Sequence, residues 1–520
     1  MAAFILPYGL AFILGLLSAI ALPPLNSLPL TLGALTAFFY IFLKMQPKRV
    51  ALYCYLFFVG YFIIGLYWIG NALLVEGNEY RWAWPLAVLG LPLGLGLFYA
   101  LAGWYSRKIS TNAGPLLKTL ILAHAIIGAE FIRSYIFTGF PWNLLGTTWS
   151  NYLPLMQSAN IWGLLGLTWL MVLISALTGY ALYETRRKLR FTSLGFAIAL
   201  ITLNYGYGLY NLNQKTERLS EKAIHVVAIQ PNISQHEKWD RFLFQKNLDK
   251  LINTTLEGIA QAQTENTPLY IIWPETALSY HFTENKNFIK QIIARFIEAA
   301  GTEDITFITG ALTREFDAAA DQMSYRNATL YFNANGDIIA DYAKSHLVPF
   351  GEYIPFQQYI PLKTVTGFTG FEKGQGPEYI TAGSLQLLNK ICYEIIFPSE
   401  FIPPRKEPEN TAHAIIHITN DAWYGASTGP YQHLNLAKYR AIENNTQIFR
   451  SANKGFSAII SSNGYTLDES NMRTQSFAYT NFYPYKTKSS VYILVGIWLT
   501  PLLLGLLNTI LLVIGLRKRI

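Results

Sequence analysis

The chain has 520 residues, of which 52% are hydrophobic and only 14% are charged, and this balance excludes an ordinary soluble protein of this length. The net charge of +8 could suggest a nucleic-acid-binding protein, but the basic residues gather beside apolar runs and form no basic, aromatic-rich stripe. Two cysteines are too few for a disulfide framework. We therefore expect a polytopic membrane protein.

The N-terminal part of the chain consists of apolar runs long enough to cross a bilayer, which takes about 20 helical residues for a hydrocarbon core about 30 Å thick. Cys54 lies inside one run, where we expect it to pack against its neighbours. Glu130 lies inside another and is followed one helical turn later by Arg133, which predicts a local ion pair. The eight predicted transmembrane helices cover residues 3–22, 28–43, 50–69, 85–105, 117–137, 161–183, 191–210 and 491–516.

The loops between these runs alternate in their content of Lys and Arg. One set is basic, at residues 44–49, 107–118, 186–190 and 517–519, whereas the alternate loops hold only Arg81 and Arg133. Because basic loops stay in the cytoplasm, we expect both termini inside the cell and the long segment before the last span outside. The predicted domains are an N-terminal membrane domain of seven helices over 1–215, an outward domain over 216–487 and a C-terminal transmembrane helix over 488–520.

The outward segment alternates between short β-rich runs and amphipathic stretches, a pattern typical of a layered α/β domain. The predicted strands cover 224–230, 269–273, 306–310, 328–332, 338–342, 385–392, 414–419 and 457–461. The predicted helices cover 240–263, 287–300 and 433–447.

Three of these strands end at residues with reactive side chains, namely Glu275, Lys344 and Cys392. Functional groups in α/β folds tend to lie just past the carboxyl ends of strands. Taken singly, each residue has a plainer interpretation: a loop carboxylate, a solvated lysine, or a small buried side chain. Taken together, the acid, the amine and the thiol predict a catalytic site.

A cysteine with an ordinary pKa of about 8.5 is mostly a thiol at neutral pH, so a nucleophilic Cys392 needs a base, for which Glu275 is the candidate. When a thiolate attacks a carbonyl group, the oxygen gains negative charge that Lys344 and the Tyr393 N–H could stabilise. The product is a thioester, which a second nucleophile can open. The trio therefore fits either two-step acyl transfer or the hydrolysis of amides and nitriles.

The strings around the trio resemble the carbon-nitrogen hydrolase (nitrilase) superfamily, whose catalytic residues are Glu, Lys and Cys in this order. They are Trp273-Pro274-Glu275, KSHLVPFGE over 344–352, Cys392-Tyr393-Glu394, and NDAWYG over 420–425. Joined to the eight spans, they make the whole chain similar to the apolipoprotein N-acyltransferase family.

This resemblance implies an αββα sandwich, periplasmic and anchored in a bacterial inner membrane. It implies transfer of a fatty acyl chain from a membrane phospholipid, typically phosphatidylethanolamine, to the N-terminal α-amine of diacylglyceryl-cysteine in apolipoproteins. Glu352 would orient Lys344 or tune its charge, unless it forms only a surface ion pair. Tyr393 and Glu394 would line the pocket, and Trp239 and Trp423 would bind substrate.

Two alternatives remain open at this stage. A membrane-bound amidase or nitrilase would use the same trio with water as the second nucleophile. A transporter or scaffold would only bind lipid, although the scarcity of charges inside the spans argues against transport. No cofactor is expected, and no zinc site is expected at His413 and His417, because these two residues bracket a strand-like run and have no Glu between them.

Overall fold

The computed structural model describes residues 2–75, 78–214, 218–238, 240–262, 267–317, 322–355, 370–401, 412–485 and 488–517. The chain divides into two compact units. A helical unit comprises Met1–Gly70, Trp82–Gln214 and Ser490–Ile520, and an α/β unit comprises Asn71–Arg81 and Lys215–Ser489. The α/β unit thus includes a short segment, Asn71–Arg81, from between two of the predicted spans.

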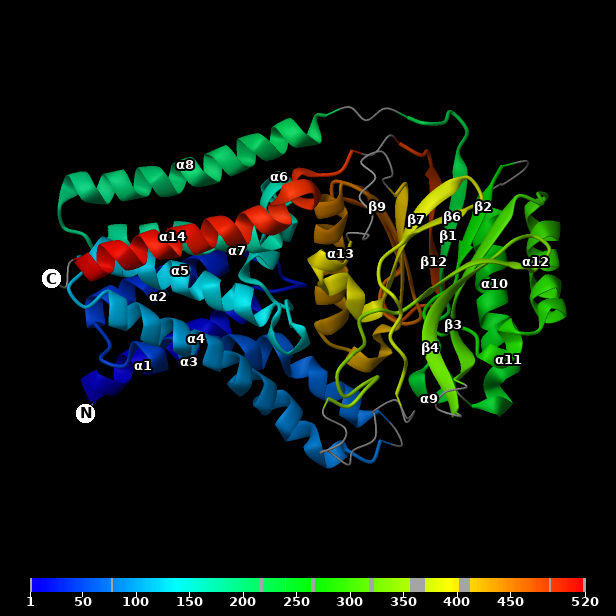
Figure 1. The fold of residues 1–520 in the computed structure, drawn as a ribbon, viewed down its shortest axis with the longest axis horizontal. Helices are drawn as coiled ribbons and strands as arrows, with labels where there is room; N and C mark the ends of the chain where they lie inside the picture. Colours follow the sequence, from blue (N-terminus) through cyan, green and yellow to red (C-terminus); the bar gives the residue numbers. More distant parts are fainter. Residues whose placement is uncertain are drawn as a thin grey trace. The chain divides into compact units, whose positions relative to one another are not determined.

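The helical unit contains a helix at each predicted span (Figure 1). Within the described ranges, six helical segments are long and apolar enough to cross a membrane: Leu28–Met45, Val50–Leu74, Arg81–Ile109, Pro115–Arg133, Ala159–Tyr183 and Tyr492–Ile514. The spans predicted over 3–22 and 191–210 are not among them and stay predictions. The helix bounds are α1 (Ala2–Ile20), α2 (Leu28–Met45), α3 (Val50–Leu66), α4 (Leu91–Ile109), α5 (Pro115–Arg133), α6 (Leu153–Met156), α7 (Ala159–Tyr183), α8 (Arg187–Leu212) and α14 (Ile497–Arg517).

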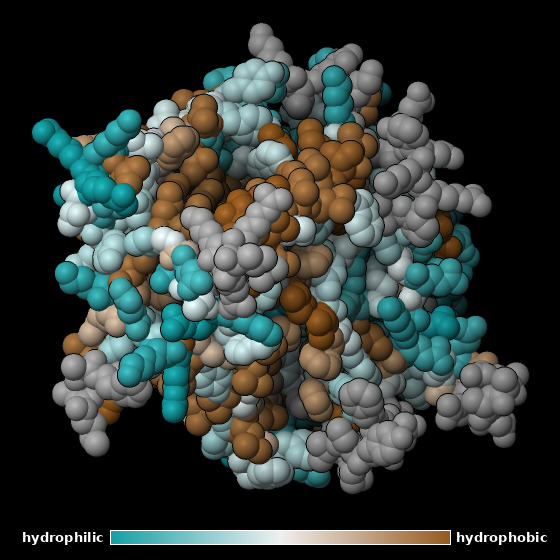
Figure 2. All heavy atoms as spheres, turned by 60° about the vertical axis from the view of Figure 1, so that its left-hand side comes forward, coloured by the Kyte–Doolittle hydropathy of each residue, from teal (hydrophilic) through white to brown (hydrophobic). Residues whose placement is uncertain are grey.

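Close contacts and a buried ion pair stabilise the helical unit. A Cβ atom added at Gly15 would lie 1.9 Å from the carbonyl oxygen of Phe57, so α1 and α3 can pack this closely only with glycine there. Cys54 is fully buried, and the predicted ion pair is confirmed, with Arg133 Nη2 2.6 Å from Glu130 Oε2. Figure 2 shows broad hydrophobic areas on the surface, and apolar side chains of α4, α8 and α14 are largely exposed, as lipid-facing residues would be.

The α/β unit contains two six-stranded sheets. The first has the order β12-β1-β2-β3-β4-β5 and the second the order β11-β10-β9-β8-β7-β6. Strands β1, β2 and β3 run parallel, as do β7, β8 and β9. The bounds are β1 (Ile224–Gln230), β2 (Leu269–Ile272), β3 (Ile305–Asp317), β4 (Gln322–Phe332), β5 (Ile338–Ala343), β6 (Tyr379–Ala382), β7 (Leu385–Ile391), β8 (Ala414–Thr419), β9 (Gln447–Ala452), β10 (Ala458–Ile460), β11 (Thr466–Glu469) and β12 (Ser476–Phe482).

The two sheets are packed against each other, and helices cover their outer faces (Figure 1). Successive residues of β1 show this layering, because Val226 joins the core between the sheets and Val227 joins the core beneath the helices. Helices α10 and α12 cover the first sheet, and α13 packs against β9 and β10. The helix bounds are α9 (Gln235–Lys238), α10 (Phe244–Ala262), α11 (Tyr280–Thr283), α12 (Lys286–Ala300) and α13 (Gly429–Asn444).

The predicted helix over 433–447 is wrong at its end. Helix α13 stops at Asn444 because Asn445 adopts a left-handed conformation with φ 51°, and the next residues, from Gln447, form β9. The predicted span over 117–137 likewise ends early, at Arg133, and Phe137 has a φ of 57°. Strands β6, β9, β11 and β12 were not predicted from the sequence.

Candidate active site

The position of Glu275 after β2 is fixed by the buried side chain of Trp273 and by close packing against Gly310. The N–H of Trp273 donates to Ile308 O at 2.8 Å, and its indole Nε1 donates to Thr255 Oγ1 of α10 at 2.9 Å. A Cβ atom added at Gly310 of β3 would lie 2.6 Å from the Cα of Glu275, so only glycine fits there. These contacts fix the turn that presents Glu275, which is 6% exposed.

Lys344 follows β5 directly and lies between two carboxylates. Its Nζ is 2.8 Å from Glu352 Oε1 and 3.8 Å from Glu275 Oε1. Asn327 of β4 holds the same carboxylates, because its Nδ2 donates to Glu275 Oε1 at 2.7 Å and to Glu352 Oε1 at 3.3 Å. The Val348 N–H donates to the other oxygen of Glu352 at 2.8 Å. Glu352 is buried, so its interpretation as a surface ion pair is wrong.

The charges of this cluster set its protonation. Burial raises the pKa of Glu275, and the nearby charge of Glu352 raises it further, although Lys344 acts in the opposite direction. Burial by itself would lower the pKa of Lys344, but the charges of Glu352 and Glu275 outweigh burial and raise it. Lys344 is therefore an ammonium group at neutral pH. The raised pKa makes the Glu275 carboxylate a stronger base, which suits a proton acceptor.

Cys392 directly follows β7 in a strained conformation, with a φ of 50°, and begins a short 3-10 helix over Cys392–Ile396. It is 7% exposed. Burial, followed by the charge of Glu275, raises the pKa of the thiol to about 12, while Lys344 acts to lower it. Cys392 is thus a thiol at neutral pH, and its reaction as a nucleophile requires a base that removes the proton in the reaction itself.

Glu394 ties the loop of Cys392 to the loop of Lys344. One carboxylate oxygen accepts from the Ile391 N–H at 2.8 Å. The other accepts from the Tyr342 hydroxyl at 2.9 Å and from the N–H and hydroxyl of Ser345 at 2.6 and 2.8 Å. Both oxygens are therefore engaged by the protein, and Glu394 positions the two loops.

Tyr393 is buried and packs edge-on against Phe397, with ring centroids 5.0 Å apart. The family resemblance implies that Tyr393 and Glu394 line the pocket beside the nucleophile. Neither residue lines the cavity described next.

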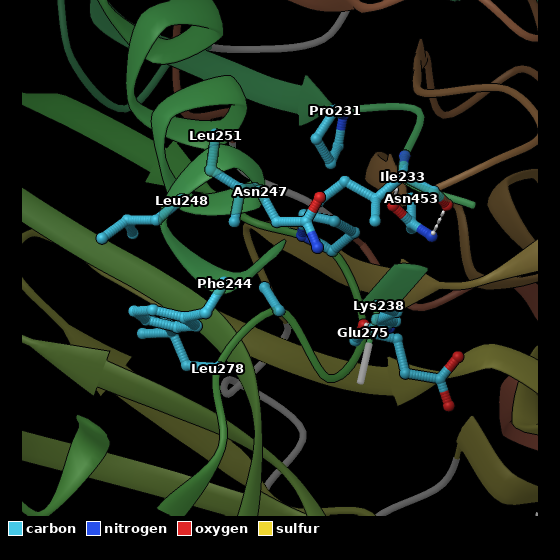
Figure 3. A pocket seen from close by; sticks show the side chains of 12 residues that line it. Pro231, Ile233, Lys238, Phe244, Asn247, Leu248, Leu251, Glu275, Leu278 and Asn453 are labelled. Carbon is cyan, nitrogen blue, oxygen red and sulfur yellow. Dashed lines mark hydrogen bonds between the residues drawn. The ribbon is translucent and has the colours of Figure 1, made fainter. Parts of the chain in front are cut away.

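A cavity of about 390 Å³, its open mouth included, adjoins Glu275 on the side of α10 (Figure 3). In this view the Glu275 carboxylate points away from Leu248 and Phe244. Lys238 lines the cavity and donates from Nζ to Glu275 O at 2.8 Å and to Thr276 Oγ1 at 2.5 Å. Burial lowers the pKa of Lys238 to about 8. The full lining is Pro231, Ile233, Lys238, Phe244, Asn247, Leu248, Leu251, Pro274, Glu275, Ala277, Leu278 and Asn453.

The two predicted substrate-binding tryptophans differ in what the structure says of them. Trp239 lies outside the described residues. Trp423 lies in the short 3-10 helix Asp421–Tyr424 after β8 and is partly buried. The Asn71 side chain donates to Tyr424 O at 2.7 Å, so the segment Asn71–Arg81 contacts this loop within the α/β unit.

Sequence reasoning missed Asn327, Lys238 and a buried polar group behind Cys392. In this group His417 and His433 both lie 3.2 Å from Cys392 O, and Arg450 pairs with Asp421 at 2.7 Å. The sequence signal for this group is His417, a polar residue within the apolar run 414–419, which the sequence analysis considered only together with His413 as a zinc site. His413 has another partner, because its Nδ1 accepts from the Gln386 N–H at 3.1 Å.

Two family models match the chain. The model of the apolipoprotein N-acyltransferase N-terminal domain matches residues 14–177, and the carbon-nitrogen hydrolase model matches residues 226–481. The second match contains Glu275, Lys344 and Cys392.

Curated relatives with the same description cover most of the chain. The apolipoprotein N-acyltransferase of Allorhizobium ampelinum is 37% identical over 421 residues, which are 79% of this chain and 75% of the relative. That of Brucella suis is 37% identical over 78% of this chain and 74% of the relative. That of Agrobacterium fabrum is 33% identical over 472 residues, which are 87% of this chain and 85% of the relative.

Among solved structures, Saccharomyces cerevisiae Nit3, described as a member of branch 10 of the nitrilase superfamily, covers 52% of this chain and 93% of its own, with 17% identity and a TM-score of 0.37. An amidase from Nesterenkonia sp. covers 51% of this chain and 93% of its own, with 15% identity and a TM-score of 0.34.

Proposed function

The chain belongs to the apolipoprotein N-acyltransferase family, and on that basis we propose that it transfers a fatty acyl chain from a membrane phospholipid to the N-terminal α-amine of a diacylated apolipoprotein. The observation that carries the proposal is the buried cluster of Glu275, Lys344 and Glu352 together with Cys392. It supplies a base, a fixed cation and a nucleophile within one site. We propose phosphatidylethanolamine as the acyl donor.

In the first step Glu275 accepts the proton of the Cys392 thiol while the sulfur attacks the ester carbonyl of the phospholipid. The carbonyl oxygen of the ester gains negative charge, which Lys344 and the Tyr393 N–H stabilise. The carbon–oxygen bond to the glycerol then breaks, and Glu275 returns the proton to the departing lysophospholipid. The acyl chain is left as a thioester on Cys392.

In the second step the α-amine of the lipoprotein attacks the thioester carbonyl. Glu275 accepts a proton from the amine, the carbon–sulfur bond breaks, and the proton returns to the sulfur. The products are an N-acylated lipoprotein and the original thiol. Glu352 keeps Lys344 in place through both steps, and Asn327 holds the Glu275 carboxylate.

The membrane location follows from the same proposal, because both substrates are anchored in lipid. The chain is a multi-pass membrane protein. We propose eight spans, both termini in the cytoplasm and the α/β unit in the periplasm, as the distribution of Lys and Arg favours. We further propose that Trp239 and Trp423 contact the lipid substrates.

The test is to incubate the purified full-length protein with phosphatidylethanolamine labelled in its acyl chains and a diacylated lipopeptide bearing a free α-amine. We expect labelled N-acyl lipopeptide and lysophospholipid in equal amounts. A lipopeptide whose amine is acetylated is the matched control and should remain unlabelled. Release of labelled fatty acid at the same rate with and without the lipopeptide would instead support a hydrolase.

A further inference from the structure

Lys238, the last residue of α9, contacts the turn that presents Glu275 (Figure 3). Its Nζ donates to Glu275 O at 2.8 Å and to Thr276 Oγ1 at 2.5 Å. Both acceptors belong to the turn itself, and neither is a carboxylate oxygen. Lys238 therefore differs from Lys344, whose Nζ lies near side-chain oxygens of Glu352 and Glu275.

The turn needs such contacts because its backbone is strained. Thr276 has a φ of 47°, a left-handed conformation that is rare for a β-branched residue and persists only with support from its surroundings. A Cβ atom added at Gly310 of β3 would lie 2.6 Å from the Thr276 nitrogen, so β3 packs closely against the turn. Lys238 supplies a second contact, from α9. Together these contacts fix the backbone from which the Glu275 side chain extends.

The segment that carries Lys238 is anchored at two places. Ile233 and Asn453 exchange two hydrogen bonds, because the Asn453 side chain donates to Ile233 O at 2.9 Å and accepts from the Ile233 N–H at 3.1 Å. The Asn247 side chain of α10 donates to Glu237 O at 2.9 Å, directly before Lys238. Lys238 itself is partly buried. Its ammonium group therefore has a defined position against the turn.

Lys238 also places a positive charge near two reacting groups. Burial lowers the pKa of Lys238 to about 8, while the charges of Glu275 and Cys392 act to raise it. Lys238 is thus mostly an ammonium group at neutral pH. The interaction with Glu275 is mutual: burial raises the pKa of Glu275, and the charges of Lys344 and Lys238 both act to lower it. Lys238 therefore favours the ionised form of the base.

The other groups around Glu275 leave three charges that matter for its ionisation. Cys392 and Tyr424 are both uncharged near and below neutral pH, because burial raises the pKa of each. The charges of Lys238 and Lys344 then act against that of Glu352. Among the described residues, the titratable groups that interact with Glu275 are Lys238 of α9, Lys344 and Glu352 after β5, Cys392 after β7 and Tyr424 after β8.

We infer that Lys238 is a positioning residue that holds the Glu275–Thr276 turn and, by its positive charge, favours the ionised form of the Glu275 carboxylate. The inference rests on the acyl transfer proposed above, in which Glu275 is the base. It gives Lys238 two effects that can be separated. The contacts with the turn set the maximal rate of acylation, and the charge sets the pH at which that rate rises.

The experiment measures acylation of Cys392 in the full-length protein by labelled phospholipid across acidic and neutral pH. No lipopeptide is added, so its amine does not contribute to the profile. Lys238→Met removes the charge and the contacts, and Lys238→Arg keeps the charge. Thr276→Val keeps the side-chain shape but removes the hydroxyl acceptor. Lys246→Met, at an exposed lysine of α10 that pairs with Glu237, is the matched control.

We expect Lys238→Met to move the acidic limb of the profile to higher pH by about 1 unit, because loss of a neighbouring positive charge raises the pKa of Glu275. Lys238→Arg and Thr276→Val should leave the limb in place. The maximal rate should fall about tenfold in Lys238→Met and Thr276→Val, since a small misplacement of a reacting group slows the reaction strongly. Lys246→Met should match wild type.

Three results would overturn the inference. The first is an unchanged acidic limb in Lys238→Met, even with a lower maximal rate, because a purely structural role would give that pattern. The second is an equal shift of the limb in Lys238→Arg, because the charge would then not be its cause. The third is a wild-type maximal rate in both Lys238→Met and Thr276→Val.

Two controls keep the result decisive. At a pH of about 10 Lys238 has lost its charge in wild type as well, so alkylation of Cys392 by iodoacetamide should stay within about threefold of wild type in Lys238→Met if the site is intact. If it is not intact, Lys238→Gln, also uncharged, replaces this variant. If wild type forms no thioester from phospholipid, the proposed donor is wrong, and acylation of Cys392 by p-nitrophenyl acetate supplies the same profiles.

Discussion

Two carboxylates keep Lys344 charged and in position, and they have different roles in the proposed reaction. Glu352 lies 2.8 Å from the ammonium group and Glu275 lies 3.8 Å from it, so the nearer acid holds Lys344 and leaves the farther one able to accept a proton. Asn327 donates a hydrogen bond to each carboxylate and so helps to fix the position of both. Both acids are glutamates, and their distances from Lys344 Nζ differ by 1.0 Å (3.8 against 2.8 Å). This difference distinguishes the proton acceptor, Glu275, from the residue that holds the lysine, Glu352.

Replacement of Glu352 by Gln should shift the acidic limb of the pH profile to lower pH. Glu275 acts as its carboxylate, so the rate rises as pH rises through its pKa. Burial raises the pKa of Glu275 and the charge of Glu352 raises it further, so removal of the Glu352 charge lowers this pKa. The measurement is kcat/KM for acyl transfer against pH, with Glu372→Gln, in a partly exposed ion pair with Arg326, as the matched control. An unchanged limb would contradict the electrostatic coupling.

Replacement of Glu275 by Gln should separate the two reactions of Cys392. Burial and then the charge of Glu275 raise the thiol pKa to about 12, so removal of the charge lowers this pKa. Alkylation by iodoacetamide at alkaline pH should then be faster, about tenfold for each unit by which the pKa falls. Acylation at neutral pH should fall about 100-fold or more because the base is lost. A parallel loss of both reactions would mean that the site had collapsed.

Glu275, Lys344 and Cys392 could be predicted because each follows a strand and stands in a distinctive string. Asn327 could not be predicted, since its role depends on the pairing of β4 with β5, which brings the Lys344 N–H to Asn327 O. His433 could not be predicted either. It lies on α13, and only the packing of that helix shows that it reaches the carbonyl of Cys392.

At the scale of elements, a single carboxylate joins the end of β5 to the end of β7. Glu394 accepts hydrogen bonds from both loops and is fully buried. Burial acts to raise the pKa of Glu394, but Lys390 and the surrounding donors outweigh it, and the pKa lies below its usual value. Lys344 and Cys392 thus keep their separation because one side chain links the strand ends that carry them.

Replacement of Glu394 by Gln should lower the free energy of unfolding by about 3 kcal/mol, because a buried amide group then faces donors. Tyr342→Phe removes one of the donors and should cost about 1 kcal/mol. Since the pKa of Glu394 is lowered by folding, its contribution is present above the usual pKa and is lost as pH falls through the folded value. Denaturant unfolding of the full-length protein in detergent at neutral and acidic pH measures this, and equal stabilities of wild type and Glu394→Gln at neutral pH would refute it.

A strand that is a continuous apolar run could be predicted over its full length, whereas short edge strands and a strand that adjoins a helix could not. β1 spans the predicted range because its seven residues are all buried and lie between two cores. β6 and β11 have four residues each and lie at the edges of the second sheet, where too few residues show a period. β9 was merged with α13, because the left-handed conformation of Asn445 that separates them has little sequence signal.

At the scale of the whole molecule, composition predicts a membrane protein but leaves two spans undecided. In α1 the described apolar stretch is Ile5–Ile20, and α8 begins with Arg187, Lys188 and Arg190, which reduce its apolar length. The α/β unit also includes Asn71–Arg81, which contacts the loop after β8 through Asn71 and Tyr424. A linear sequence cannot show such a contact, because 353 residues separate its two partners.

The proposed orientation predicts opposite labelling of two exposed loop positions. In a Cys54→Ala background, Glu79→Cys in the Asn71–Arg81 segment should react with a membrane-impermeant thiol reagent added to intact spheroplasts. Asn112→Cys, in the basic loop between α4 and α5, should react only after permeabilisation. The reverse pattern would place the α/β unit in the cytoplasm and contradict the proposed location.

The central claim is that the acyl chain passes through Cys392, and a pulse and chase on the intact protein tests it most directly. Purified protein is incubated with phosphatidylethanolamine and its mass is measured, after which a diacylated lipopeptide with a free α-amine is added. The account predicts a mass increase of one acyl group on the peptide that contains Cys392, followed by its quantitative transfer to the lipopeptide amine. Acyl transfer at the wild-type rate by Cys392→Ala, with no thioester at any time, would contradict it.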